Sequence, residues 1–192
     1  MKFLDKRTIK LGRIQSNLDE FVLDFVKILG KHTNYVIVSG YVAILFGRSR
    51  TTEDIDIIIP KITRKKFSGL FKDATKAGFW FLNSSKEGDL YELLESKSSI
   101  RAAINGQTIP NIEIKFSKTF IDNASLSSRL TVKIGNEKLF ISPLELQIAY
   151  KEKVLKSFKD IEDAKHLRIV FDKNLNKEEI DFYKKEMTKN GA

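Results

Sequence analysis

The stretch VSGYVAILFGRSRTTEDIDIIIP, residues 38–60, carries the strongest structural signal in the chain. It begins at the end of a short apolar strand, turns at Ser39-Gly40, continues through a short helical segment that ends at Gly47, and finishes in the strand DIDIII, which Pro60 closes. Helix follows strand again after Pro60, and such alternation is typical of layered α and β structure. We therefore predict an α+β fold with α/β-like layers, in which helices flank a mixed β-sheet.

Two aspartates interrupt the isoleucines of this last strand. Because side chains alternate along a strand, Asp54 and Asp56 share one face with Ile58, whereas the other isoleucines share the opposite face and must pack into a core. Two carboxylates about 7 Å apart repel each other unless a cation lies between them, and Mg²⁺ prefers carboxylate oxygens and substrate phosphates. The pattern favours a metal site, with an acidic, solvent-facing edge strand as the alternative. If the extended backbone already begins at Arg50, then Arg50 and Thr52 lie on the same face as the two aspartates.

The Ser39-Gly40 turn is a candidate anion site. It joins a strand to the first turn of a helix, where unpaired backbone N–H groups and the helix dipole favour a negative group such as phosphate. By itself, Ser-Gly would favour an ordinary turn. Beside a metal-binding strand, however, the turn indicates a site for phosphoryl or nucleotidyl transfer.

A third carboxylate is available in the segment PNIEIKFS, residues 110–117. Alternation places Glu113 on one face of a strand with Asn111 and Lys115, and places apolar residues on the other face. A glutamate in this position is a candidate general base for an attacking hydroxyl, or a ligand to a second metal ion. The alternative is an ion pair with a residue of the neighbouring strand.

Charged residues also occupy the apolar stripes of two predicted C-terminal helices. At 100° per residue from Leu144, Lys151 lies near the middle of the first stripe, and the same arithmetic places Asp160 and Asp163 on the stripe of the next helix. Buried charges are costly unless they are paired, so we expect these three groups to meet each other or to project into the active cleft. A structural ion pair of Lys151 with an aspartate, pinning the helices to the sheet, is the alternative.

The remaining pattern predicts a single domain over residues 1–192, with a core at about 15–142 and a C-terminal helical segment at about 143–192. Periodicity and turn residues predict helices at 18–29, 63–78 and 89–95, strands at 35–38 and 79–82, and hairpins that turn at Asn105-Gly106 and Gly135-Asn136. From Pro143 onward we predict roughly three helical segments, broken near Ser157 and at residues 172–176.

The composition is that of a globular protein and excludes several kinds of site. The 192 residues contain no cysteine and two histidines, which excludes disulfides, thiolate zinc sites, cysteine nucleophiles and a histidine metal cage. The N-terminus lacks the apolar region of a signal peptide, and no segment approaches 18 uninterrupted apolar residues. We therefore expect a soluble cytoplasmic protein with no membrane partner.

The chain is basic, with 34 Lys and Arg against 25 Asp and Glu and a net charge of +9. Residues 143–192 hold 11 basic and 10 acidic groups, so the surplus lies in residues 1–142, with 23 basic and 15 acidic groups. A field of this sign favours anionic partners, above all nucleotides and nucleic acids. A lysine-rich solvated surface is the alternative.

Taken in order, these residues resemble the nucleotidyltransferases of the DNA polymerase beta superfamily, and most closely the minimal nucleotidyltransferases and AbiEii-type toxins of prokaryotes. Those proteins carry a glycine-rich turn, an arginine, a threonine and an aspartate pair, which here are Ser39-Gly40, Arg50, Thr52, Asp54 and Asp56. They also carry a late helical lysine and a K-D-x-x-D element, which match Lys151 and the run from Lys159 through Asp160 to Asp163. The family usually has Gly-Gly or Gly-Ser at the turn and often an aspartate at the third acidic position.

The resemblance implies a nucleotidyltransferase fold and a role for each residue. The expected catalytic residues are Asp54, Asp56, Glu113 and Lys151, and the first three would bind Mg²⁺ or Mn²⁺. The expected nucleotide-binding residues are Ser39, Gly40, Arg50, Thr52, Lys151, Asp160 and Asp163. The implied reaction moves a nucleoside monophosphate from an NTP to a hydroxyl of a tRNA end, a protein or a small molecule. A toxin-type enzyme of this kind would also have a cognate antitoxin.

Two other interpretations remain open. Glu113-Ile114-Lys115 matches the E-x-K half of a metal-dependent nuclease motif, but a nuclease leaves Ser39-Gly40 and the K-D-x-x-D helix unexplained. A catalytically degenerate member of the fold, which binds a nucleotide, a partner protein or RNA without turnover, is supported by the Ser-Gly order of the turn and by Glu113.

Overall fold

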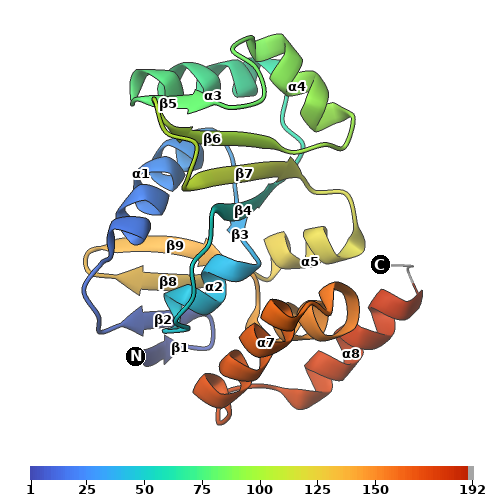
Figure 1. Ribbon diagram of the computed structural model, residues 1–192. Helices are drawn as coiled ribbons and strands as arrows, with labels where there is room; N and C mark the ends of the chain where they lie inside the picture. Colours follow the sequence, from blue (N-terminus) through green and yellow to red (C-terminus); the bar gives the residue numbers. More distant parts are fainter. Residues whose placement is uncertain (190–192) are drawn as a thin grey trace.

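One nine-stranded β-sheet runs through residues 1–189, the part of the chain that the computed structural model describes. The strand order is β1-β2-β8-β9-β3-β4-β7-β6-β5 (Figure 1). The strands are β1 Lys2–Asp5, β2 Thr8–Leu11, β3 Val36–Ile37, β4 Asp54–Ile59, β5 Phe79–Phe81, β6 Ile100–Ile104, β7 Asn111–Phe116, β8 Leu130–Ile134 and β9 Glu137–Ile141. Three pairs are parallel, β2–β8, β3–β9 and β4–β7, and the others are antiparallel, so the sheet is mixed, as predicted.

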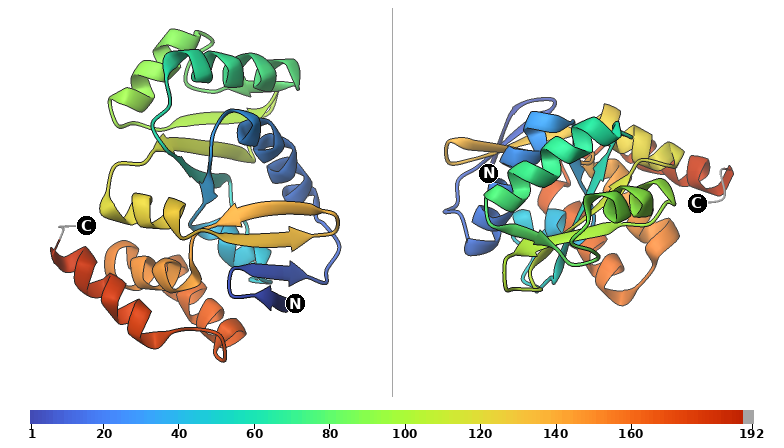
Figure 2. Two further views of the ribbon diagram at one scale, coloured as in Figure 1. Left: turned by 180° about the vertical axis from the view of Figure 1, so that it is seen from behind. Right: turned by 90° about the horizontal axis from the view of Figure 1, so that it is seen from above.

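Helices cover both faces of the sheet, with α1 behind it and α2 in front of it in Figure 1 and the reverse in the left view of Figure 2. The helices are α1 Asn17–His32, α2 Gly40–Leu45, α3 Arg64–Lys76, α4 Glu87–Glu95, α5 Phe120–Ser127, α6 Leu144–Tyr150, α7 Phe158–Phe171 and α8 Lys177–Lys189, and a π-helical turn spans Lys151–Leu155. The C-terminal helices α7 and α8 lie on the side of α2 and α5 (Figure 1). The three predicted C-terminal helical segments are confirmed.

The core face of the sheet is the one that α1 covers. Phe25 of α1 packs edge-on against Phe79 of β5, with ring centroids 5.0 Å apart. The residue pairs across β5, β6, β7 and β4 place Ile55 and Ile57 of β4 on this same face, and both are fully buried. Because side chains alternate along a strand, Asp54 and Asp56 must face the other way, toward α2. The predicted division of the DIDIII strand into a core face and a site face is therefore confirmed.

Three elements were not predicted from the sequence: β1, β2 and α5. β2 pairs in parallel with β8, so the sheet includes residues before position 15, where we had expected the core to begin. Each N-terminal strand has only four residues, β1 has no buried residue, and the partner that joins the pair to the sheet, β8, is remote in the sequence. By contrast, α5 has a local signal that could have been found, because Thr119 and Asp122 form a capping box at its start.

The end of helix α1 differs from the prediction. Helix α1 continues past Gly30 to His32, and the backbone N–H of Thr33 closes its last turn on the carbonyl of Leu29. A single glycine weakens a helix without ending it when the surrounding face is buried.

In the described residues, no helix is long and apolar enough to span a membrane.

Candidate active site

The turn between β3 and α2 has an unusual backbone. Ser39 adopts φ 65° and ψ −138°, a conformation that glycine reaches readily and other residues only with strain of about 1–3 kcal/mol. Its backbone N–H donates a hydrogen bond to Oε1 of Gln147 at 3.2 Å. Ser39 thus takes a glycine-like backbone conformation although it carries a side chain.

Gly40 makes room for Arg50. A Cβ added to Gly40 would lie 2.9 Å from Nη2 of Arg50 and 3.2 Å from its Cζ. The guanidinium is also held from the other side, because its Nη1 donates to Oδ2 of Asp163 at 2.6 Å. The glycine of the turn is therefore required by the close approach of an arginine that links the turn to α7.

The two aspartates of β4 have no ion-pair partner among the described side chains. Asp54 and Asp56 are both partly buried, and neither forms a salt bridge with any residue in the described part of the chain. The pKa of Asp56 is raised to about 6, chiefly by burial and then by the charges of Asp54 and Glu113, although hydrogen bonding by the Ser39 side chain and the charge of Lys115 oppose the rise. Two neighbouring carboxylates without an ion-pair partner fit a divalent cation such as Mg²⁺, which would supply positive charge.

Glu113 lies beside the aspartates but points to a different partner. It is the register neighbour of Asp56 on β7 and of Arg101 on β6. Its Oε2 accepts hydrogen bonds from Nε of Arg101 at 2.9 Å and lies 2.8 Å from Nη2. Within residues 1–189, no three acidic or histidine side chains are placed to hold a metal ion together. The cross-strand ion pair, which the sequence left open as an alternative, is the arrangement that the structure contains.

Lys151, Asp160 and Asp163 contact each other, as expected for charges on the apolar stripes. Nζ of Lys151 donates to Oδ1 of Asp160 at 2.9 Å and to Oδ2 of Asp163 at 3.0 Å, and both Lys151 and Asp163 have 0% exposure, whereas Asp160 is partly exposed. Arg50 reaches the same oxygen of Asp163, and Nε of Arg48 lies 3.5 Å from the other oxygen. Three cations therefore surround the two carboxylates, and through Arg50 this cluster contacts the turn at Gly40.

Thr52 contacts the backbone of the first aspartate. Its hydroxyl donates to the backbone carbonyl of Asp54 at 2.8 Å. Thr52 also lines a hollow with Phe21, Ile104 and Pro110. Its hydrogen bond thus holds the start of β4, and its hydroxyl is engaged with the backbone.

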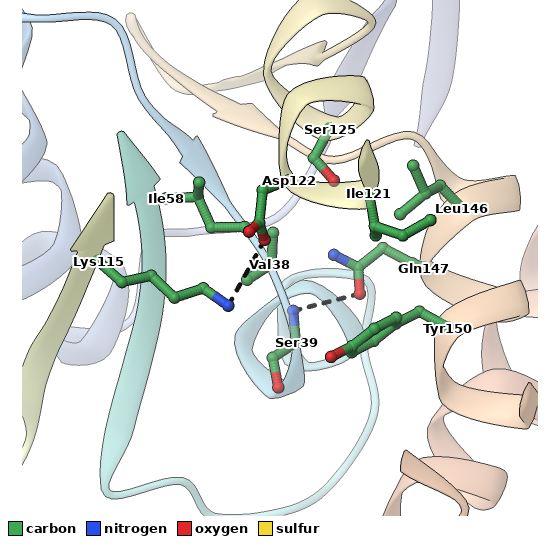
Figure 3. Close-up of a pocket in the computed structure, with 10 residues that line it drawn as sticks. All are labelled: Val38, Ser39, Ile58, Lys115, Ile121, Asp122, Ser125, Leu146, Gln147 and Tyr150. Carbon is green, nitrogen blue, oxygen red and sulfur yellow. Dashed lines mark hydrogen bonds and ion pairs between the residues drawn. The ribbon is translucent and has the colours of Figure 1, made fainter. Parts of the chain in front are cut away.

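A pocket opens next to Ser39, between the sheet and helices α5 and α6 (Figure 3). Its cavity volume is about 40 Å³, and it is lined by Val38, Ser39, Ile58, Lys115, Ile121, Asp122, Ser125, Leu146, Gln147 and Tyr150. Lys115 reaches toward Asp122 across its mouth, with Nζ and Oδ1 3.5 Å apart. Sequence reasoning missed Asp122, Gln147 and Tyr150, although Gln147 lies one turn before Lys151 on the same helical stripe.

Solved structures share this arrangement of sheet and helices. The nucleotidyltransferase ANT(2'')-Ia, in complex with adenylyl-2''-tobramycin, matches with a TM-score of 0.59 and 13% identity over 92% of this chain and 100% of that chain. The chain has a nucleotidyltransferase fold. A solution structure of the antibiotic-resistance factor ANT(2'')-Ia matches with a TM-score of 0.53 and 11% identity, over 91% of this chain and 94% of that one.

A third structure with the nucleotidyltransferase fold is an antigenic nucleotidyltransferase-like protein from Paracoccidioides brasiliensis, with a TM-score of 0.53 and 16% identity over 92% of this chain and 89% of that one. No protein-family model matches the sequence, and no curated protein sequence is similar to it. At these identities the likeness establishes the fold, and the chemistry must be argued from the side chains of this chain.

Proposed function

We propose that this protein is a Mg²⁺-dependent nucleotidyltransferase that moves a nucleoside monophosphate from an NTP to a hydroxyl group. The observation that carries the proposal is the pair Asp54 and Asp56, two adjacent carboxylates without a cation partner, beside the strained turn at Ser39-Gly40. Mg²⁺, held by these two aspartates, would neutralise charge on the phosphates of the NTP. Mn²⁺ has the same ligand preferences and would substitute for it.

In the proposed reaction, the acceptor oxygen attacks the α-phosphorus of the NTP. One P–O bond forms, the bond from the α-phosphorus to the bridging oxygen breaks, and pyrophosphate leaves with the bonding electrons, while the hydroxyl proton passes to solvent. The protein contributes positioning and charge more than covalent chemistry. Ser39 and Gly40 would hold the triphosphate, and Arg50 and Lys151 would keep that turn in place through their contacts with Asp163.

The pocket of Figure 3 adjoins Ser39, and Lys115, Gln147 and Tyr150 offer polar groups in its lining. Its volume of about 40 Å³ has room for a few water molecules and not for a nucleoside. The triphosphate would therefore lie over the turn and the aspartates, and the nucleoside would lie outside this pocket.

For the acceptor we propose a tRNA end, a protein hydroxyl or a small molecule. The net charge of +9 supports RNA. The complex of ANT(2'')-Ia contains an adenylyl group joined to tobramycin, which supports a small molecule. The motif resemblance to AbiEii-type toxins supports tRNA or protein, and with it a cognate antitoxin.

A transfer assay tests this function. The protein is incubated with a total cell lysate, Mg²⁺ and each of the four labelled NTPs, and label transferred to RNA, protein and small molecules is separated and counted. We expect transfer with at least one NTP and its loss in the double variant Asp54→Asn/Asp56→Asn, with circular dichroism unchanged. Transfer by the double variant at the wild-type level would refute the assignment.

A second candidate function is nucleotide or RNA binding without turnover. Two observations support it. The Glu113 carboxylate is already paired with Arg101, and the backbone N–H of Ser39 already donates a hydrogen bond to Gln147. NTP binding without transfer in the same assay would establish this second function. Nicking of a plasmid with Mg²⁺ or Mn²⁺ and no NTP would instead point to the nuclease suggested by Glu113 and Lys115.

A further inference from the structure

Three charged side chains stand in a row across the open face of the sheet. Asp56 on β4 is the register neighbour of Glu113 on β7, and Glu113 is the register neighbour of Arg101 on β6. All three lie on the face opposite the isoleucines, and adjacent strands are about 4.8 Å apart. Glu113 therefore has a carboxylate on one side and a guanidinium on the other at similar backbone distances.

Glu113 is turned toward the guanidinium. Both Arg101 contacts, from Nε at 2.9 Å and Nη2 at 2.8 Å, go to the same oxygen, Oε2. The Arg101 side chain is 50% exposed and that of Glu113 is 21% exposed. Exposed ion pairs are weak because water competes for both partners, so the Arg101–Glu113 ion pair can be broken at a small free-energy cost.

The alternative direction, toward Asp56, is unfavourable only while no cation is present. Asp54 and Asp56 already repel each other, and the charge of Glu113 adds to the effect on Asp56. A divalent cation at the aspartates would reverse the sign of this interaction, since carboxylate oxygens are its preferred ligands. The longer glutamate side chain allows Glu113 to turn from one neighbour to the other.

We propose that Arg101 is a positioning residue that competes with a divalent cation for Glu113. Arg101 holds Glu113 in an ion pair directed away from Asp56, so that Asp54 and Asp56 would bind the first cation and Glu113 would become a ligand only after Arg101 releases it. This inference rests on the proposed metal site at the two aspartates. It assigns Arg101, which the motif resemblance does not include, to the control of metal occupancy.

Mn²⁺ titration of the nucleotide-free, full-length protein tests this assignment without any activity measurement. Free Mn²⁺ is followed by its electron paramagnetic resonance signal, which gives the number of bound ions and their affinity. We expect Arg101→Gln to bind Mn²⁺ about three- to tenfold more tightly than wild type, or to bind one additional ion, because the competitor of Glu113 has been removed. Arg101 is exposed, so the variant should fold normally, and a thermal melt confirms this.

A double-mutant cycle separates action through Glu113 from a general effect of charge. In a Glu113→Gln background, Arg101→Gln should change Mn²⁺ affinity less than twofold. Lys115→Gln is the matched control, because Lys115 is a second cation on the same face whose charge acts on Asp56. Its effect should be the same with and without Glu113.

The outcomes distinguish this proposal from the metal site on which it rests. If wild type binds Mn²⁺, Asp56→Asn abolishes the binding, and Arg101→Gln changes neither affinity nor stoichiometry, the role of Arg101 is refuted and the metal site stands. The role is also refuted if the effect of Arg101→Gln persists in the Glu113→Gln background. If neither wild type nor Arg101→Gln binds Mn²⁺, both proposals fail.

Discussion

The substitution Asp56→Asn should stabilise the protein at neutral pH, although it removes a residue proposed to bind the metal. Burial, followed by the nearby charge of Asp54, raises the pKa of Asp56 from 3.8 to about 6 in the folded protein. The folded state therefore holds a proton that the unfolded state has lost between these two pH values, and the free energy of unfolding falls as pH rises through this interval. At about 1.4 kcal/mol per pH unit, the loss amounts to about 3 kcal/mol, and to about 2 kcal/mol after allowance for partial solvent screening.

Asparagine resembles the protonated aspartic acid and carries no charge at any pH in this range. The Asp56→Asn variant should therefore match wild type below about pH 4 and exceed its stability by about 2 to 3 kcal/mol above pH 7. Urea unfolding at pH 4, 5, 6, 7 and 8, in the presence of EDTA, measures the difference. Glu53→Gln is the matched control, because Glu53 is an exposed acidic residue directly before the same strand, and its effect should stay within about 0.5 kcal/mol.

Two results would refute this reasoning. The first is a variant that is less stable than wild type at pH 8, which would mean that the Asp56 carboxylate is already compensated by a favourable partner. The second is a difference between the two proteins that does not depend on pH, which would mean that packing rather than charge separates them. Added Mg²⁺ should raise the stability of wild type and leave the variant unchanged, because only the folded wild type retains both aspartates.

Two further predictions concern the charged residues around the turn. Lys151→Met should lower the free energy of unfolding by about 3 kcal/mol, because it leaves Asp163 buried with fewer cations. The control Lys153→Met, at an exposed position, should change the free energy of unfolding by less than about 0.5 kcal/mol. Equal melting temperatures for the two variants would contradict the buried pairing. Gly40→Ala should lower the free energy of unfolding by about 1 to 3 kcal/mol, since its Cβ would press on an Arg50 guanidinium held by Asp163. The control Gly88→Ala, whose Cβ meets nothing within 4 Å, should leave the free energy of unfolding unchanged or raise it. A thermal melt of Gly40→Ala at or above the wild-type temperature would show that Arg50 is free to move.

Local patterns were sufficient to predict the face that carries the chemistry. Alternation in the DIDIII strand separated Asp54 and Asp56 from the core isoleucines, and helical periodicity identified Lys151 and Asp163 as charges on a buried stripe. Both inferences depend on periods of two and 3.6 residues, which follow from backbone geometry and hold in any tertiary setting.

Contacts between distant segments could not be predicted in the same way. Arg50 and Asp163 lie 113 residues apart, and no local signal states that they will meet. The pairing of β2 with β8 was missed for the same reason, because β8 lies more than 100 residues later. For Arg101 and Glu113, the predicted hairpin at Asn105-Gly106 brings their strands together, but the exact register was not predicted. The choice between a metal ligand and a cross-strand ion pair for Glu113 was made by the strand order, which sets Arg101 beside it.

The sequence by itself determined the two-faced strand, the buried lysine and the resemblance that points to nucleotidyl transfer. Only the tertiary structure decided that Ser39 takes a glycine-like backbone conformation, that the Arg50 guanidinium packs against Gly40, and that Glu113 pairs with Arg101 and not with a group at Asp56. The physical reason is the distance along the sequence over which each interaction acts. Side-chain alternation and helical periodicity act over a few residues, whereas electrostatic pairing and close packing depend on which distant segments the fold brings together.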